Sequence, residues 1–268
     1  MVSHVWNPQQ QERNRFVRFR TAYTFDRFVD LPRGGRHRIL DYGCGEGHSI
    51  DALLERFPEA HVVAVDIADA AMSTCNSRFG DHPRVTALQA TNGFAFDAIG
   101  NDFDVIQLNA VFEHLLPDER RHIVLGLWRR LVVGGYFVVT ETPWRWFPIE
   151  THTTSFPLVN YLPDALALLA VRHCGRYPKT LTWHDALKQG VRGATVREIV
   201  GCLGASEDAV QIVRSVAPDA RDMLEVWWHG ECRKTGRRAL AYSTLSWLRR
   251  LTGVVLSPWV NVVLRKRA

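Results

Sequence analysis

The chain has 268 residues, 46% of them hydrophobic, with a formal net charge of +5 and a pI of about 9.1. This length and apolar content predict one globular domain with a sizeable insertion and exclude a disordered or fibrous chain. The basic residues are spread along the sequence, which indicates a solvated surface and argues against a nucleic-acid-binding protein. The five cysteines form no C-x-x-C pair, so we expect reduced thiols in a cytosolic protein and no zinc site.

The N-terminal segment is polar, and residues 1–16 contain no apolar core, so we expect no signal peptide. Between Pro8 and Val29, aromatic residues recur at helical spacing with Arg between them. This pattern predicts a helix that covers the main fold or forms a lid over a binding site. The longest apolar stretch, residues 251–264, is too short for a spanning helix, so we predict no transmembrane segment.

From residue 38 onward, short apolar segments alternate with helical patterns. We expect helices over residues 46–57, 68–78, 117–131 and 195–203, with Gly134 and Gly135 ending the third of them. This alternation is typical of α/β proteins with a parallel, doubly wound sheet. The strands that we expect are residues 38–42, 61–67, 85–90, 103–109, 136–141, 209–216 and 259–264.

The alternation stops after Pro143 and returns near residue 195. We therefore expect an N-terminal helical cover (1–35), a nucleotide-binding core (36–143) and a substrate cap (144–194). Residues 195–268 would return to the core, with a helical insertion at 219–253.

A glycine-rich turn follows the first expected strand. Ile39–His48 reads I-L-D-Y-G-C-G-E-G-H, and Asp66 ends the second strand. Such a turn lets the backbone approach a ligand, and a carboxylate at the position of Asp66 can accept hydrogen bonds from a ribose diol. A dinucleotide and S-adenosylmethionine both fit. The spacing D-x-G-x-G-x-G, with Glu46 inside the turn, favours a sulfonium ligand over a pyrophosphate.

With these residues, the chain resembles the class I S-adenosylmethionine-dependent methyltransferases over roughly residues 38–143. Within that family it resembles the type 11 and type 12 enzymes, which act on small molecules. Four segments carry the resemblance: L-D-Y-G-C-G-E-G, V-V-A-V-D-I, F-D-V-I-Q-L-N-A-V-F-E-H-L and L-V-V-G-G-Y-F-V-V-T-E-T-P. It implies a Rossmann-like seven-stranded sheet with an antiparallel last strand. It also implies S-adenosylmethionine as cofactor and S-adenosylhomocysteine as product.

The resemblance implies that the glycine turn contacts the methionine and adenosine portions, that Asp66 holds the ribose, and that Asn109 faces the methyl group. Where the family commonly has an Asp after the third strand, this chain offers Thr91 and Asn92. The cofactor-binding residues that we expect are Asp41, Gly43, Cys44, Gly45, Gly47, Asp66, Ile67, Thr91, Asn92 and Asn109.

The expected cap begins with residues 144–163, which resemble a segment of methyltransferases from bacterial sugar and surface-glycan pathways. A hydroxyl nucleophile usually needs a base. We expect His152 to be that base, with Glu150 as its orienting partner or as the alternative base; the competing interpretation is a structural role for His152. His and Asp are otherwise scattered, so we expect no required metal. The substrate-binding residues that we expect are His114, Trp144, Arg145 and Trp146, with Arg145 holding an anionic group.

The sequence therefore predicts a methyltransferase that acts on a small-molecule hydroxyl of a sugar, a glycan precursor or another secondary metabolite. The alternatives are N- or C-methylation, a non-catalytic S-adenosylmethionine-binding module and, less well supported, a nicotinamide dehydrogenase. Residues 109–112 read N-A-V-F, which does not match the N/D-P-P-Y pattern of amino-methylating DNA enzymes. The Trp-rich, basic C-terminal segment suggests weak contact with a membrane surface or a lipid-linked acceptor, although core and cap helices explain it more simply. We expect a monomer or a homodimer.

Overall fold

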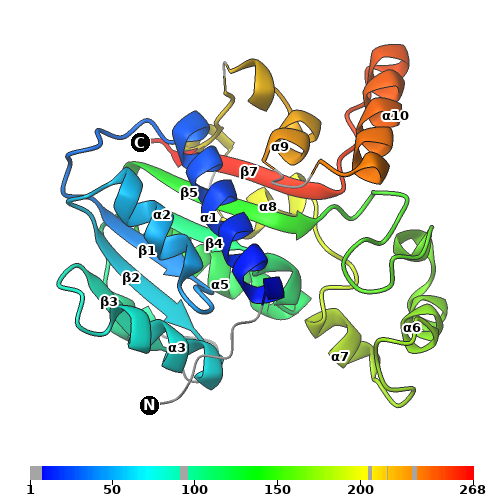
Figure 1. The fold of residues 1–268 in the computed structure, drawn as a ribbon, viewed down its shortest axis with the longest axis horizontal. Helices are drawn as coiled ribbons and strands as arrows, with labels where there is room; N and C mark the ends of the chain where they lie inside the picture. The colour runs from blue at the N-terminus through cyan, green and yellow to red at the C-terminus, as the bar shows by residue number, and fades with distance from the viewer. Residues whose placement is uncertain (1–7, 91–95, 205–206, 216, 231–233) are drawn as a thin grey trace.

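The computed structural model describes residues 8–90, 96–204, 207–215, 217–230 and 234–268. Its centre is a seven-stranded sheet with the strand order β3-β2-β1-β4-β5-β7-β6 (Figure 1). The first five strands pair in parallel, and β7 runs antiparallel to both of its neighbours. The predicted fold class is thereby confirmed. The strands are β1 (Arg38–Tyr42), β2 (His61–Asp66), β3 (Val85–Gln89), β4 (Phe103–Asn109), β5 (Leu131–Pro143), β6 (Val210–Ile212) and β7 (Trp259–Lys266).

Two layers of helices cover the sheet. Successive strand residues such as Ile39 and Leu40 are both fully buried, because their side chains point to opposite covered faces. One face packs against α1 (Pro8–Phe28), α2 (His48–Arg56) and α3 (Asp69–Phe79). The other packs against α4 (Phe96–Ile99), α5 (Pro117–Arg130) and α8 (Val196–Cys202).

The fifth strand begins earlier than the sequence suggested. Helix α5 ends at Arg130 and β5 starts at Leu131, so Gly134 and Gly135 lie inside the strand and do not end the helix. The pairing of β5 with β4 shifts register between Leu131 and Tyr136, and Gly134 has a φ of +86° there. A glycine pair thus marks an irregular strand start, which resembles a helix stop in sequence.

After β5 the chain forms a separate small layer, for which we keep the name cap (residues 144–194). It contains η2 (Val159–Tyr161), α6 (Asp164–His173) and α7 (Trp183–Lys188). The buried Arg192 side chain donates hydrogen bonds to three backbone carbonyls of residues 159–162 and pairs with Asp164. This cation holds together a layer with few buried apolar residues. They are Val159, Ala167, Val171, Ala186 and Val191.

Two further helices lie beside β7. α9 (Met223–His229) packs near the strand, and α10 (Gly236–Thr252) stands at the edge of the molecule (Figure 1). Three short helical turns complete the described secondary structure. They are η1 (Phe112–His114), η3 (Glu207–Ala209) and η4 (Pro218–Ala220).

Candidate active site

The glycine turn joins β1 to α2 and is packed on one side only. The N–H groups of Gly43 and Cys44 both donate to the Val65 carbonyl, over 2.7 and 3.0 Å. Gly43 has a φ of +80°, and a Cβ placed on it would lie 2.2 Å from a methyl group of Val111. Gly45 has a φ of +54°, but a Cβ there would meet nothing within 4 Å. One glycine therefore permits close packing, and the other exposes backbone to an open space.

That open space is a cavity of about 660 Å³, a volume typical of cofactor sites. Its walls come from the glycine turn, the start of α2, the carboxyl ends of β4 and β5, and α1. This is the edge at which open α/β sheets bind nucleotides. The lining residues are Asn14, Phe16, Val17, Gly43, Cys44, Gly45, Glu46, His48, Ser49, Ala71, Asn109, Ala110 and Glu141.

Two carboxylate side chains that were predicted to bind the cofactor support the glycine turn in different ways. Asp66 accepts the N–H groups of Gly45 and Ala68, over 2.8 and 2.9 Å, at the end of β2. Asp41 is buried beneath the turn and accepts a hydrogen bond from the Ser49 hydroxyl. Burial raises the pKa of Asp41 to about 6. Neither Asp41 nor Asp66 is among the residues that line the cavity, so their roles in binding the cofactor stay predictions.

Helix α1 supplies one wall of the cavity. Arg20 on this helix forms a mostly buried ion pair with Glu141 at the end of β5. Glu141 has a φ of +63°, and its N–H donates to the Asn261 side chain over 3.0 Å. Sequence reasoning missed Arg20 and Glu141. The available signals were the acid in T-E-T-P and a basic residue among the apolar positions of the helix.

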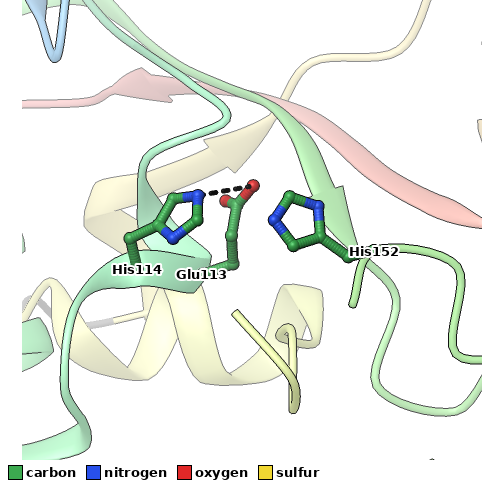
Figure 2. Close-up of side chains that lie close together, drawn as sticks. All are labelled: Glu113, His114 and His152. Carbon is green, nitrogen blue, oxygen red and sulfur yellow. Dashed lines mark ion pairs between the residues drawn. The ribbon is translucent and has the colours of Figure 1, made fainter. Parts of the chain in front are cut away.

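The turn after β4 brings three ligand-type side chains together. Figure 2 shows the Glu113 carboxylate between the imidazoles of His114 and His152. One potential ligand atom from each residue lies within 4.8 Å of the other two, and His114 Nε2 is 4.0 Å from Glu113 Oε1. Side chains of these types can hold a divalent metal. The expectation that such residues are scattered is therefore wrong for these three, whereas the expectation that no metal is required stays a prediction.

Burial controls the charge of this cluster. Glu113 is fully buried, which raises its pKa to about 8, although the Thr142 hydroxyl donates to it over 3.1 Å. Burial and the neighbouring His114 lower the pKa of His152 to about 4. At pH 7, Glu113 therefore keeps its proton and His152 is neutral.

Glu150 contacts the backbone of the following turn. Its buried carboxylate accepts the N–H groups of residues 152, 153 and 154, over 2.5 to 3.0 Å, and the Thr154 hydroxyl over 2.8 Å. It thus fixes His152 through the main chain, and these hydrogen bonds give no support to the predicted pairing with the ring. The His152 ring instead packs edge-on against His114 and Trp259, with centroids 5.2 and 6.0 Å apart.

The predicted substrate-binding side chains lie near the junction of β5 and the cap. Arg145 is half-buried, and its backbone N–H donates to the backbone carbonyl of Ala194 over 2.9 Å. Its Nη1 is buried and has no hydrogen-bond partner among the described residues. Burial, and repulsion by Arg192, lower its pKa. Trp144 packs against the sheet core and against the cluster that Phe147 forms with α9 and α10, and the half-exposed Trp146 lies against Tyr161.

The cavity and the cluster of Glu113, His114 and His152 are formed by neighbouring residues of the chain. Asn109 and Ala110 line the cavity, and η1 with Glu113 and His114 follows them directly. Likewise Glu141 lines the cavity and the next residue, Thr142, contacts Glu113. None of the cavity-lining residues belongs to the predicted catalytic or substrate-binding set, so those roles stay predictions.

Three predicted cofactor contacts differ in how the structure places them. The Ile67 side chain is exposed beside Asp66, at the same end of the sheet. Gly47 lies at the start of α2, where a Cβ would press against Phe79 and Cys75. Thr91 and Asn92 lie outside the described residues.

Comparisons with known proteins agree with this geometry. A family model described as a methyltransferase domain matches residues 39–135. A trans-aconitate 2-methyltransferase of Variovorax paradoxus (strain S110) is 37% identical over 229 residues, which cover 76% of this chain and 85% of the relative. A malonyl-[acyl-carrier protein] O-methyltransferase of Paenibacillus sp. (strain JDR-2) is 34% identical over 38% of each chain. The chain spans about half or less of the length of several such relatives.

Solved structures share the fold at low sequence identity. A TehB-like S-adenosylmethionine-dependent methyltransferase of Corynebacterium glutamicum has a TM-score of 0.50 at 15% identity, covering 97% of this chain and 96% of the other. The plantazolicin methyltransferase BpumL, in complex with a monoazolic desmethylPZN analog and S-adenosylhomocysteine, has a TM-score of 0.51 at 12% identity, covering 96% of this chain and 84% of the other.

The cofactor assignment follows from these observations together. The open glycine turn, the acid ending β2 and the adjoining cavity fit S-adenosylmethionine. The sheet order with its antiparallel β7 and the 37% identical relative agree with that assignment. The chain belongs to the class I S-adenosylmethionine-dependent methyltransferases.

Proposed function

We propose that this enzyme transfers a methyl group to a carboxylate oxygen of a small acidic molecule and forms a methyl ester. The observation that carries the proposal is the similarity to enzymes named for carboxylic acids, one of them 37% identical to this chain, and the burial that lowers the pKa of His152 to about 4 agrees with it. A hydroxyl acceptor needs a base whose pKa lies near the working pH. A carboxylate is already ionised at neutral pH and needs no base. The carboxylate acceptor thus replaces the hydroxyl acceptor as the first candidate.

The names of the relatives support this choice. Trans-aconitate and the malonyl group on acyl carrier protein are both carboxylic acids, and the enzymes that bear these names are similar to this chain. The Variovorax relative covers most of the chain, including part of the region beyond the core. A sugar hydroxyl has no such support among these relatives.

The electrostatics around the expected acceptor position also favour an anion. Glu113 keeps its proton at pH 7, and Glu141 is paired with Arg20, so neither acid presents an unbalanced negative charge. Arg145 offers a buried nitrogen without a hydrogen-bond partner among the described residues. We assign Arg145 to a spectator carboxylate of the acceptor, since a guanidinium binds carboxylates well.

Bound S-adenosylmethionine supplies the electrophilic methyl group. In our proposal, the turn backbone and Asp66 hold the cofactor, and Asn109 lies at the methyl end. The protein then aligns the acceptor oxygen with the methyl carbon and excludes water. His114 and His152 form a polar wall beside the acceptor.

The test is methyl transfer from radiolabelled S-adenosylmethionine to trans-aconitate, to malonyl-[acyl-carrier protein] and to a nucleotide sugar. The labelled product is then treated with mild alkali. A methyl ester releases its label as volatile methanol, whereas a methyl ether or amine retains it. We expect volatile label from an acidic acceptor, and alkali-stable label from the sugar alone would overturn the proposal.

A further inference from the structure

Exposed apolar side chains gather at one end of the molecule. Of the fifteen large hydrophobic residues that are exposed in the described chain, seven lie in the cap and four in or directly after α10. Figure 1 places α6, α7 and α10 at the same end of the long axis. Soluble proteins rarely leave such side chains clustered, so this end is a candidate interaction surface. The eleven residues are Trp146, Ile149, Phe156, Leu158, Tyr161, Leu166, Leu169, Leu240, Trp247, Leu251 and Val254.

We call the four residues of the C-terminal group the α10 stripe (Leu240, Trp247, Leu251 and Val254). They are 70%, 59%, 63% and 53% exposed. Spacings of seven and four residues place the first three on one side of the helix, and Val254 follows just beyond the helix end. A single exposed Leu needs no explanation, but three large apolar side chains on one helix face, with a fourth beside them in sequence, do.

The opposite side of α10 is fixed to the protein. Leu245 packs in a buried cluster, and the Tyr242 hydroxyl donates to Glu225 over 2.8 Å. Arg249 pairs with Asp222 and with Glu225, over 2.5 and 2.9 Å. These contacts hold the helix in one rotation, with the α10 stripe outward.

The helix that carries the stripe has charged residues of a single sign. Helix α10 contains four Arg residues and no acid. Residues 234–258 contain five basic residues and no acid. At 100° per residue, Arg237 and Arg250 lie about 60° and 80° to either side of Leu240. Both are exposed.

We propose that the α10 stripe docks this enzyme on the surface of an anionic lipid bilayer. The helix would lie in the plane of the headgroups, with its Leu, Trp and Val side chains at the acyl boundary and the flanking Arg residues on lipid phosphates. No helix in the described part of the chain is long and apolar enough to cross a membrane.

Charge decides between a bilayer and a second copy of the chain. Another copy would bring the same acid-free, Arg-flanked face, and like charges would meet around the apolar line. Anionic headgroups pair with those guanidinium groups instead. The cap helices α6 and α7 lie at the same end of the molecule as α10, and the cap also has exposed apolar side chains.

Co-sedimentation of the full chain with vesicles tests the proposal. One vesicle population contains phosphatidylcholine and phosphatidylglycerol, and the other contains phosphatidylcholine alone. We expect at least ~10-fold tighter binding to the anionic vesicles at low salt, with a decrease as salt rises. Equal binding to both populations, or no binding to either, overturns the proposal.

Two double variants test whether vesicle binding depends on the α10 stripe or on exposed apolar side chains in general. The double variant Trp247→Ser with Leu251→Ser should lose at least ~10-fold in affinity for anionic vesicles. The matched control is Val133→Ser with Ile212→Ser, which removes two exposed apolar side chains elsewhere and should bind like wild type. Methyl transfer to a water-soluble acceptor should be unchanged in both. If light scattering instead shows a dimer that only the stripe variant dissociates, the stripe is an interface between copies and the bilayer proposal fails.

Discussion

The cofactor side and the proposed acceptor side of this protein are formed by different kinds of groups. On the cofactor side, backbone groups of one short turn, together with the ends of neighbouring strands, surround the cavity. On the acceptor side, side chains from η1 and the cap meet only after the chain has folded. The first arrangement depends on local glycine geometry and the second on long-range packing. Variants should therefore affect the two sides in different ways.

Gly43→Ala is expected to have the largest effect on the cofactor side. A Cβ there would lie 2.2 Å from Val111, so S-adenosylhomocysteine should bind on the order of 100-fold more weakly by calorimetry. The matched control is Gly45→Ala, which shares the positive φ but meets no neighbour and should lose less than about 10-fold. Equal losses would show that backbone strain, and not packing, sets the requirement for glycine.

Glu141→Gln should have the next largest effect, a loss of stability, because it leaves Arg20 buried beside a neutral side chain. Breaking a mostly buried ion pair costs about 3 kcal/mol, measurable by chemical denaturation. Adding Arg20→Met to this variant should recover part of the loss, since it removes the buried charge that Glu141 neutralised. A double variant less stable than the single one would argue against the ion pair as the cause.

His152→Ala should have only a modest effect on the rate, in contrast to the loss expected for a general base. With a carboxylate acceptor, kcat should fall less than about 10-fold, and the shape of the pH–rate profile should not change. Removal of a true base would cost roughly 100-fold or more and abolish one limb of the profile. That second result would restore the hydroxyl acceptor and the original role of His152.

Glu113→Gln should alter how stability depends on pH. The pKa of Glu113 is raised to about 8 in the folded protein, so the unfolded chain releases this proton at lower pH and wild-type stability falls as pH rises from about 4.5 to 8. The Glu113→Gln variant has no such proton to release, so its stability should not fall in this way as pH rises. Its Tm relative to wild type should therefore rise by roughly 10 °C between about pH 4.5 and pH 8. Glu59→Gln, at an exposed position, is the control and should show no such trend.

Dialysis against a chelator should have the smallest effect. We expect activity to stay within about two-fold of the untreated enzyme, because the proposed chemistry needs no metal. The His152→Ala variant is dialysed in parallel. If wild type alone lost activity and zinc restored it, Glu113, His114 and His152 would be a metal centre.

The fold was predictable from sequence because its signals are local. Strand β1, the glycine turn and Asp66 follow one another with fixed spacing, and apolar alternation marked most strand boundaries within one or two residues. Gly134 and Gly135 were misread because a glycine pair marks a helix end and a strand irregularity equally well. Strand β6 is shorter than predicted because it is an edge strand, and its length is set by its pairing with β7.

The acceptor side was less predictable because its contacts join distant parts of the chain. Glu150 and His152 were singled out as a pair by proximity in sequence, but the carboxylate bonds to backbone and the ring packs beside His114. The pairing of Arg20 with Glu141 spans 121 positions and has no short-range signal. The low basicity of His152 comes from burial, which sequence spacing does not reveal.

Helix α1 has a consequence for how ligand occupancy can be observed. The same helix that contributes Asn14, Phe16 and Val17 to the cavity is fastened to β5 by Arg20 and to η4 by Arg27. Docking of the helix and binding in the cavity therefore share contacts, and by thermodynamic linkage each strengthens the other. Amide hydrogen exchange along α1 should then slow when S-adenosylhomocysteine is bound, so the N-terminal helix reports whether the cavity is filled.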